Sequence, residues 1–323
     1  MLSLRMTILL LMLPSAGPVA AEWQAIIVET PGRVTTVDVK DDDARIAIGK
    51  TWYRLDPAAG SLQQAAPFQH PKPPSGSLRD ARVAVGRDIV ARAWLADPTD
   101  RYQHGILGDS IEAGSLHIAR RDGTQGALRL GADAVFEDIE PRIAMIGGSE
   151  KIVVVKSYLS RGSAVAIVDP RSATVVAETA PVGHPHAWVS PAGFADFDGD
   201  GTIDMALVRQ PHVVGVMELW SWQHGRLVKS GEVADVSNHF VGSRSLHMNH
   251  VADFDGDGHP DIAVPDRERR TLRLIGFAPK SHDIARIVLP ARVATNIGGL
   301  PVGDRAALVF GLEDGRLVLV RNR

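Results

Sequence analysis

The sequence contains no cysteine and no block of lysine or arginine residues. The first absence excludes disulfide bonds, a thiol nucleophile and a lipid-modified cysteine. The second, together with a formal net charge of −3, argues against a nucleic-acid partner, because phosphate binding needs clustered basic side chains. The folded chain must therefore obtain its stability from packing or from a bound metal ion.

The apolar spacing of long amphipathic helices is also missing. Apolar residues instead form many short runs, which glycine, aspartate and proline separate. Short runs at regular spacing are typical of an all-β sandwich, barrel or propeller. The clearest runs are 25–28, 34–39, 152–155, 164–168, 213–219, 272–275 and 317–320.

The apolar run near the N-terminus, residues 6–13, is too short for a membrane span, which takes about 20 residues. Arg5 precedes this run, and the small residues Val19 and Ala21 follow it. This layout is typical of a secretory signal peptide. We therefore predict a signal peptide over residues 1–21 and a mature domain over residues 22–323. The mature protein is expected to be periplasmic or secreted, without an integral membrane span.

The mature sequence repeats itself. "GFADFDG" at 193–199 and "HVADFDG" at 250–256 are nearly identical, and weaker relatives share their spacing. The repeats are about 50 residues apart, which suits one four-stranded blade of a β-propeller each. We predict a single β-propeller with six blades, or seven if a further blade lies around residues 115–130. The register marks are Ala47, Ala84, Ala144, Ala195, Ala252 and Gly298.

The two ends of the mature chain each hold part of a blade. Only 25 residues follow Gly298, enough for about two strands, and residues 23–40 hold two more before the first mark. We predict that an N-terminal strand completes the last sheet, which removes the open edge.

Acidic residues crowd two of the repeats, "DFDGDGTID" (196–204) and "DFDGDGHPD" (253–261). Calcium takes six to eight oxygen ligands, so loops of this kind suit two calcium sites. Without a cation, the carboxylates would repel and raise one another's pKa. The predicted ligands are Asp196, Asp198, Asp200, Thr202 (backbone carbonyl) and Asp204 in the first loop, and Asp253, Asp255, Asp257, His259 (backbone carbonyl) and Asp261 in the second.

Two other interpretations of these loops compete with the calcium site. A helical calcium hand needs an acidic residue at loop position 12, where Leu207 and Val264 stand instead. Plain aspartate–glycine turns are the second alternative. Two matching copies favour the calcium site over the turns.

The two stretches resemble the FG-GAP / VCBS-type repeats of integrin-α-like β-propellers. The resemblance covers about 14 residues at each site, and it implies that each loop joins neighbouring strands of a blade and carries calcium. The other blades lack the carboxylates, for example at 147–150, so two calcium ions are implied. That family usually has seven blades, from which six is a departure.

Histidines gather next to these loops: seven of the twelve fall between residues 184 and 250. Segments that enter the innermost strands of a propeller lie near its central channel. A ligand-binding rim, or a site for a transition metal, is therefore one interpretation. Water and backbone contacts, or core packing for the tryptophan, are the other. The candidate rim residues are His186, Trp188, His239, His247, Asn249 and His250.

No catalytic motif stands out. There is no phosphate-binding loop, no zinc-binding HExxH and no nucleophile elbow. We predict an exported, calcium-binding propeller that acts as a non-enzymatic binding module for a protein or carbohydrate ligand. The alternative is an extracellular carbohydrate-active lyase or hydrolase that uses the histidine-rich rim. Convergence of these histidines into one pocket with a basic residue such as Arg244 would favour the enzyme, and their dispersal would favour the module.

Overall fold

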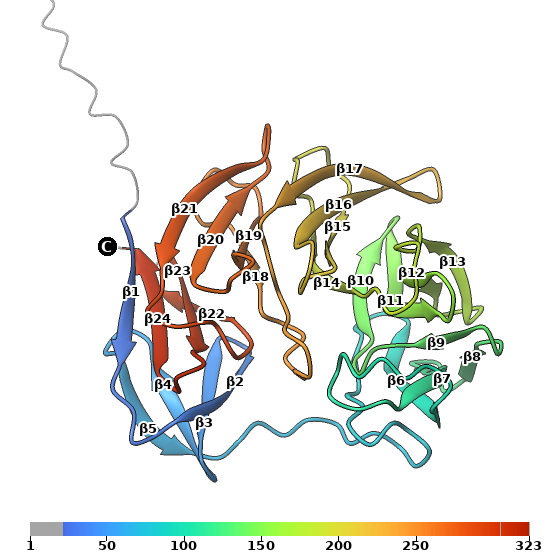
Figure 1. The fold of residues 1–323 in the computed structure, drawn as a ribbon, viewed down its shortest axis with the longest axis horizontal. Helices are drawn as coiled ribbons and strands as arrows, with labels where there is room; N and C mark the ends of the chain where they lie inside the picture. The colour runs from blue at the N-terminus through green and yellow to red at the C-terminus, as the bar shows by residue number, and fades with distance from the viewer. Residues whose placement is uncertain (1–21, 304, 323) are drawn as a thin grey trace, which may run out of the picture.

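The computed structural model describes residues 22–303 and 305–322, so the predicted signal peptide over 1–21 lies outside the described residues. Throughout the described part the regular elements are β-strands, β1 to β24. Antiparallel sheets built from these strands surround a common centre (Figure 1). The prediction of an all-β propeller is confirmed.

Three sheets are simple meanders in which each strand pairs with the next along the chain. The second strand of each sheet is rich in aliphatic residues and largely buried. The first sheet holds β2 (Val34–Lys40), β3 (Asp43–Ile48), β4 (Thr51–Asp56) and β5 (Ser61–Ala65). The second holds β14 (Val189–Ala195), β15 (Asp204–Arg209), β16 (Val216–Gln223) and β17 (Arg226–Ala234). The third holds β18 (His250–Ala252), β19 (Asp261–Pro265), β20 (Thr271–Gly276) and β21 (His282–Val288).

A fourth four-stranded sheet joins the two ends of the described chain. It consists of β22 (Gly298–Val302), β23 (Arg305–Gly311), β24 (Leu317–Asn322) and β1 (Trp23–Val28). The register of β1 on β24 runs from the pair Trp23 and Asn322 to the pair Val28 and Leu317. Closure of the last sheet by an N-terminal strand is thereby confirmed. Of the two strands in residues 23–40, β1 makes this closure and β2 begins the first sheet.

The remaining strands form one eight-stranded sheet. The short strand β9 joins its two halves because it pairs with both β7 and β11. The six-blade prediction depends on counting this sheet as two blades, so the number of blades stays a prediction. The strands are β6 (Val90–Thr99), β7 (Glu112–Arg120), β8 (Gln125–Arg129), β9 (Ala134–Phe136), β10 (Arg142–Ile146), β11 (Ser149–Tyr158), β12 (Gly162–Asp169) and β13 (Thr174–Glu178).

The register marks mostly identify the first strand of each repeat. Ala144, Ala195, Ala252 and Gly298 lie in β10, β14, β18 and β22. Two marks are exceptions. Ala47 lies in β3, the second strand of its sheet, where the first strand is β2. Ala84 lies in no strand and forms only an isolated bridge with Ala93.

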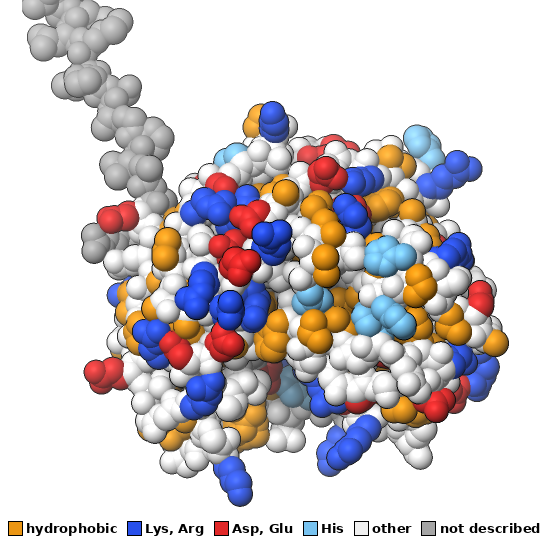
Figure 2. Space-filling model, viewed as in Figure 1, with side chains coloured by type: hydrophobic (Ala, Val, Ile, Leu, Met, Phe, Trp, Pro, Cys, Tyr) orange, Lys and Arg blue, Asp and Glu red, His pale blue; other side chains and the backbone are white. Residues whose placement is uncertain are grey.

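The core lies between neighbouring sheets rather than at the centre of the ring. One cluster packs Val153 of β11 and Val165 of β12 against Met205 of β15 and the buried Trp188. Another packs β18–β20 against β23 and β24 through side chains such as Leu274. On the face shown in Figure 2, acidic and basic side chains are interspersed rather than gathered into one patch of a single sign.

Candidate functional site

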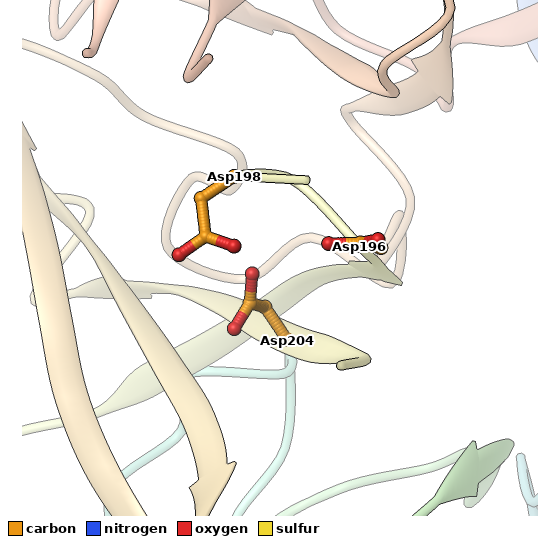
Figure 3. Close-up of side chains that lie close together, drawn as sticks. All are labelled: Asp196, Asp198 and Asp204. Carbon is orange, nitrogen blue, oxygen red and sulfur yellow. The ribbon is translucent and has the colours of Figure 1, made fainter. Parts of the chain in front are cut away.

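The first acidic loop connects β14 with β15, two neighbouring strands of one sheet. Asp204 begins β15 and is only 1% exposed, whereas Asp198 is exposed in the loop. Carboxylate oxygens of Asp196, Asp198 and Asp204 all lie within 4.8 Å of one another. Figure 3 shows the carboxyl groups of Asp198 and Asp204 facing each other.

Hydrogen bonds within the loop hold this arrangement. The backbone N–H of Gly201 donates to Asp196 Oδ2 at 3.0 Å, and the N–H of Phe197 donates to Asp204 Oδ2 at 3.3 Å. The Ser221 hydroxyl, on β16, also donates to Asp204. The tight curvature requires glycine, because Gly201 has a φ of +85°. Sheet and loop together therefore orient the carboxylates.

The second acidic loop connects β18 with β19 and repeats the geometry. Oxygens of Asp253, Asp255 and Asp261 lie within 4.8 Å of one another. The N–H of Phe254 donates to Asp261 Oδ2 at 2.7 Å, and that of Gly258 donates to Asp253 Oδ2 at 3.0 Å. These are the same bonds, at the same loop positions, as in the first loop.

The two groups of carboxylates carry uncompensated negative charge. Burial raises the pKa of Asp261 to about 7, and repulsion from Asp255, Asp253 and Asp257 adds to this rise. Burial likewise raises the pKa of Asp204, with Asp198 contributing. A cation placed among these oxygens would relieve both the burial penalty and the repulsion.

One oxygen in the first loop has no partner among the described residues. Asp196 Oδ1 is buried and accepts no hydrogen bond. A buried acceptor left unpaired costs free energy. A bound cation would satisfy it, and the three carboxylates supply the hard oxygen ligands that calcium prefers. The donor set therefore fits calcium at this loop.

Four of the predicted ligands lie outside the three-carboxylate groups. Asp200 Oδ1 accepts the N–H of Thr202 at 2.7 Å, and Asp257 Oδ1 accepts the N–H of His259 at 2.8 Å. The carboxylates of Asp200 and Asp257, and the carbonyls of Thr202 and His259, stay predicted ligands. The two loops also touch, because a Cβ on Gly199 would lie 2.5 Å from Cε1 of His259.

The predicted rim residues do not share one site. His247, Asn249 and His250 line a central cavity of about 800 Å³. His186, Trp188 and His239 are not among the residues that line it, so their placement on a common rim was wrong. The rim prediction took position along the chain as a guide to position in space. Loops between strands instead carry these three side chains into the packing between sheets and onto the outer surface.

A second group of histidines, His212 and His239, packs around the buried Trp188. The Trp188 indole N–H donates to the Glu137 carbonyl at 3.1 Å. His239 Nε2 bonds the Ser243 carbonyl at 2.9 Å, and its Nδ1 lies 3.0 Å from Nε2 of His212. Burial lowers the pKa of His239 to about 3 and that of His212 to about 4. Both rings are therefore neutral near pH 7.

His186 lies at the surface beside this group. Its ring centroid is 5.2 Å from those of both Tyr102 and His104. Arg244 does not join it, because the Arg244 guanidinium bonds Asp80 at 2.7 Å and Asp109 at 2.8 Å. The predicted rim residues therefore fall into two groups, one lining the cavity and one around Trp188, and the Arg244 guanidinium is bound to aspartates instead of to either group of histidines.

The central cavity is lined by seven segments of the chain. Several of them belong to first strands of the repeats, such as β2, β10, β14 and β22. On the face in Figure 2 the surface is hollowed below the centre, and histidine and acidic side chains lie set back there. The segments are 36–39, 70–71, 81–83, 140–143, 191–194, 247–251 and 296–299.

The charged residues of the cavity had no signal in the sequence. Arg82 Nη1 lies 3.1 Å from Glu140 Oε2, and His247 Nε2 lies 3.3 Å from the same oxygen. Burial alone would raise the pKa of Glu140, but the hydrogen bond and charge of His247, with the nearby arginines, lower it overall. Glu140 therefore stays ionised. Its position just before a first strand is the only feature that could have identified it.

Comparisons with known proteins agree with the acidic loops. Residues 196–264 match the family described as FG-GAP-like repeat. This match spans both loops and the strands between them. No curated protein sequence matched the chain.

Several solved structures are similar in fold at low sequence identity. BamB from Moraxella catarrhalis is 14% identical with a TM-score of 0.37, covering 88% of this chain and 71% of that one. The exotype rhamnogalacturonan lyase YesX is 12% identical with a TM-score of 0.42, covering 86% of this chain and 55% of that one. BBS1N, solved in complex with ARL6DN, is 12% identical with a TM-score of 0.43, covering 94% and 98%.

The strand order, the closed last sheet and the acidic hairpin loops define an all-β propeller. More particularly, residues 196–264 match the FG-GAP-like repeat, and both acidic loops fall within this match. Among the described residues, no helix is long and apolar enough to span a membrane.

Proposed function

We propose that the protein is an exported, calcium-binding β-propeller that acts as a non-enzymatic binding module for a protein or carbohydrate ligand. The observation that carries the calcium part is the convergence of three carboxylates in each acidic loop. The buried, unpartnered oxygen of Asp196 supports it independently.

Calcium would be held by the carboxylates of Asp196, Asp198 and Asp204 in the first loop, and by the matching set in the second. When bound, the ion would supply positive charge and oxygen coordination. The chain itself supplies the orientation, since Phe197 N–H and Ser221 fix Asp204 at the start of β15. The ion would thus join each loop to the strands on both sides of it.

Three of the six predicted rim residues lie outside the cavity, which supports a binding module over an enzyme that uses the whole rim. His247 and His250 line the cavity, while His239 is buried and neutral beside Trp188. The Arg244 guanidinium is paired with two aspartates and does not line the cavity. No pair of these groups has the mutual geometry of a nucleophile with its base.

Titration calorimetry of the chelator-treated mature chain tests the calcium part. We expect about two calcium ions per chain, and weak binding of magnesium because it demands a tighter octahedral shell. The Asp198→Ala and Asp255→Ala variants should each bind one ion fewer. A wild-type chain that binds no calcium would contradict the proposal.

A glycan array and a pull-down with the calcium-loaded mature chain test the binding part. The expected result is retention of a carbohydrate or protein without chemical change to it. Turnover of a retained glycan, detected as new reducing ends or unsaturated products, would contradict the non-enzymatic role and favour the carbohydrate-active alternative.

A further inference from the structure

The central cavity has the size of a small-molecule site. Its volume of about 800 Å³ falls within the range of roughly 300–1,000 Å³ that is common for such sites. A folded protein partner cannot enter a space of this size, although it can bind elsewhere on the propeller. The occupant of the cavity must therefore be a small molecule or a short chain of linked units.

Free hydrogen-bonding groups are present at one side of the cavity. Glu140 Oε2 forms hydrogen bonds with the side chains of both Arg82 and His247. No hydrogen bond from the described residues reaches Glu140 Oε1. Asn296 Oδ1 accepts a hydrogen bond from the backbone N–H of His247 at 3.2 Å. The side-chain amide nitrogen of Asn296 makes no hydrogen bond within the described part of the chain. The wall thus offers an ionised acceptor and an amide donor, which come from the segments that lead into β10 and β22.

The charges of the cavity are balanced. Arg82 is paired with Glu140, and Arg142 with the buried Asp138. Both arginines of the lining therefore already have an acidic partner, and neither is free to bind an anionic ligand. An uncharged ligand therefore fits this lining better than a carboxylate or phosphate ligand.

Other parts of the wall are aliphatic, although Asp38, His70 and Asn249 add polar groups. Val39, Val83, Ile143 and Ile297 contribute from four separate segments. The His250 ring packs against Gly299 and forms one part of the wall. The packing is close, because a Cβ on Gly299 would lie only 2.0 Å from Nε2 of His250. Apolar walls with a few convergent polar groups are typical of specific ligand sites.

We propose that the central cavity binds a short, uncharged oligosaccharide. Sugar hydroxyls both donate and accept hydrogen bonds, so they can donate to the ionised Glu140 and accept from Asn296. The apolar faces of the rings can lie on the aliphatic wall. This inference rests on the proposed function as a binding module, since it chooses carbohydrate from the two ligand classes and places it in the molecule.

The test uses ligand-observed NMR and calorimetry on the calcium-loaded mature chain. The probes are glucose, galactose, mannose, lactose and cellobiose, with glucuronate as a charged counterpart. Two variants alter the cavity: Glu140→Gln removes the ionised acceptor, and Thr36→Trp fills the space from an exposed lining position. Glu232→Gln is the matched control, because Glu232 is exposed on β17 outside the cavity.

At least one neutral sugar should bind the wild type. The Glu140→Gln variant should bind the same sugar about tenfold more weakly than the wild type, as expected for loss of a hydrogen bond to a charged group. Thr36→Trp should abolish binding, and Glu232→Gln should leave it unchanged. Three results would overturn the proposal: no neutral sugar binds, only glucuronate binds, or both cavity variants bind like the wild type. Calcium titration of the same samples separates this failure from failure of the calcium sites.

Discussion

Removing one loop carboxylate should remove about half of the stability that calcium confers. If calcium binds only the folded chain, one site contributes roughly 2.7 kcal/mol at a concentration about 100-fold above its dissociation constant, and two sites about twice that. Asp198 suits the perturbation because its carboxylate is exposed and accepts only the N–H of Asp200, at 3.2 Å. The Asp198→Ala variant should therefore lose one site with little damage to the fold.

Calorimetric melts with calcium or with chelator measure this effect. In a domain of this size, 1 kcal/mol corresponds to a shift of roughly 2–4 °C, so loss of one site should lower the calcium-dependent rise by about 5–10 °C. Asp255→Ala should behave in the same way, and the double variant should lose nearly the whole rise. Asp122→Ala is a matched control, because Asp122 accepts a similar local bond from Thr124 N–H at 2.9 Å in a turn outside the acidic loops.

The chelator melts carry information of their own. Without calcium, removal of Asp198 relieves repulsion on the buried Asp204, so the variant should melt no lower than the wild type. A wild-type melting temperature that does not respond to calcium would refute the reasoning. The acidic loops would then be aspartate–glycine turns.

Three further predictions concern other parts of the chain. Mass spectrometry of the exported protein should find a mature N-terminus at or near Glu22, and an intact first residue would contradict export by a cleaved signal. Burial lowers the pKa of His239 from 6.5 to about 3 in the folded chain. As the pH drops, His239 is therefore protonated in the unfolded chain before it is protonated in the folded chain. The contribution of His239 to the free energy of unfolding should be complete above about pH 6.5, and the free energy should fall toward pH 4. The fall should be smaller in His239→Gln; an equal pH dependence of the two chains in denaturant titrations would refute this. Gly199→Ala should lower the melting temperature, since a Cβ there meets the His259 ring at a φ of +76°; an unchanged melt would show that the ring moves freely.

The acidic loops could be predicted from the sequence because every part of them is local. Nine consecutive residues contain the carboxylates, the glycines and the strand that follows, so the spacing alone indicates the hairpin and its charge. The apolar runs at 34–39, 152–155 and 317–320 could be identified for the same reason, and each lies within a strand. Strand closure followed from the length left over at both ends.

The cavity could not be predicted in this way. Its residues come from seven segments, and each contributes only a few positions, some in strands and some in the segments that connect them. The ion pair of Arg82 with Glu140 joins two parts of the chain with no shared motif. The rim prediction went wrong at Trp188 and His239 because proximity to a first strand does not determine which way a connecting loop turns.

The pairing of β1 with β24 also affects how the chain folds. Trp23 and Asn322 stand opposite each other although almost the whole described chain lies between them. During synthesis, β1 emerges first and has no partner strand until residues 317–322 follow. Contacts of such long sequence separation form slowly, and the apolar strand and the edge of β24 stay open to other chains until they meet. The last sheet is therefore the part of the propeller where a folding chain is most exposed to aggregation.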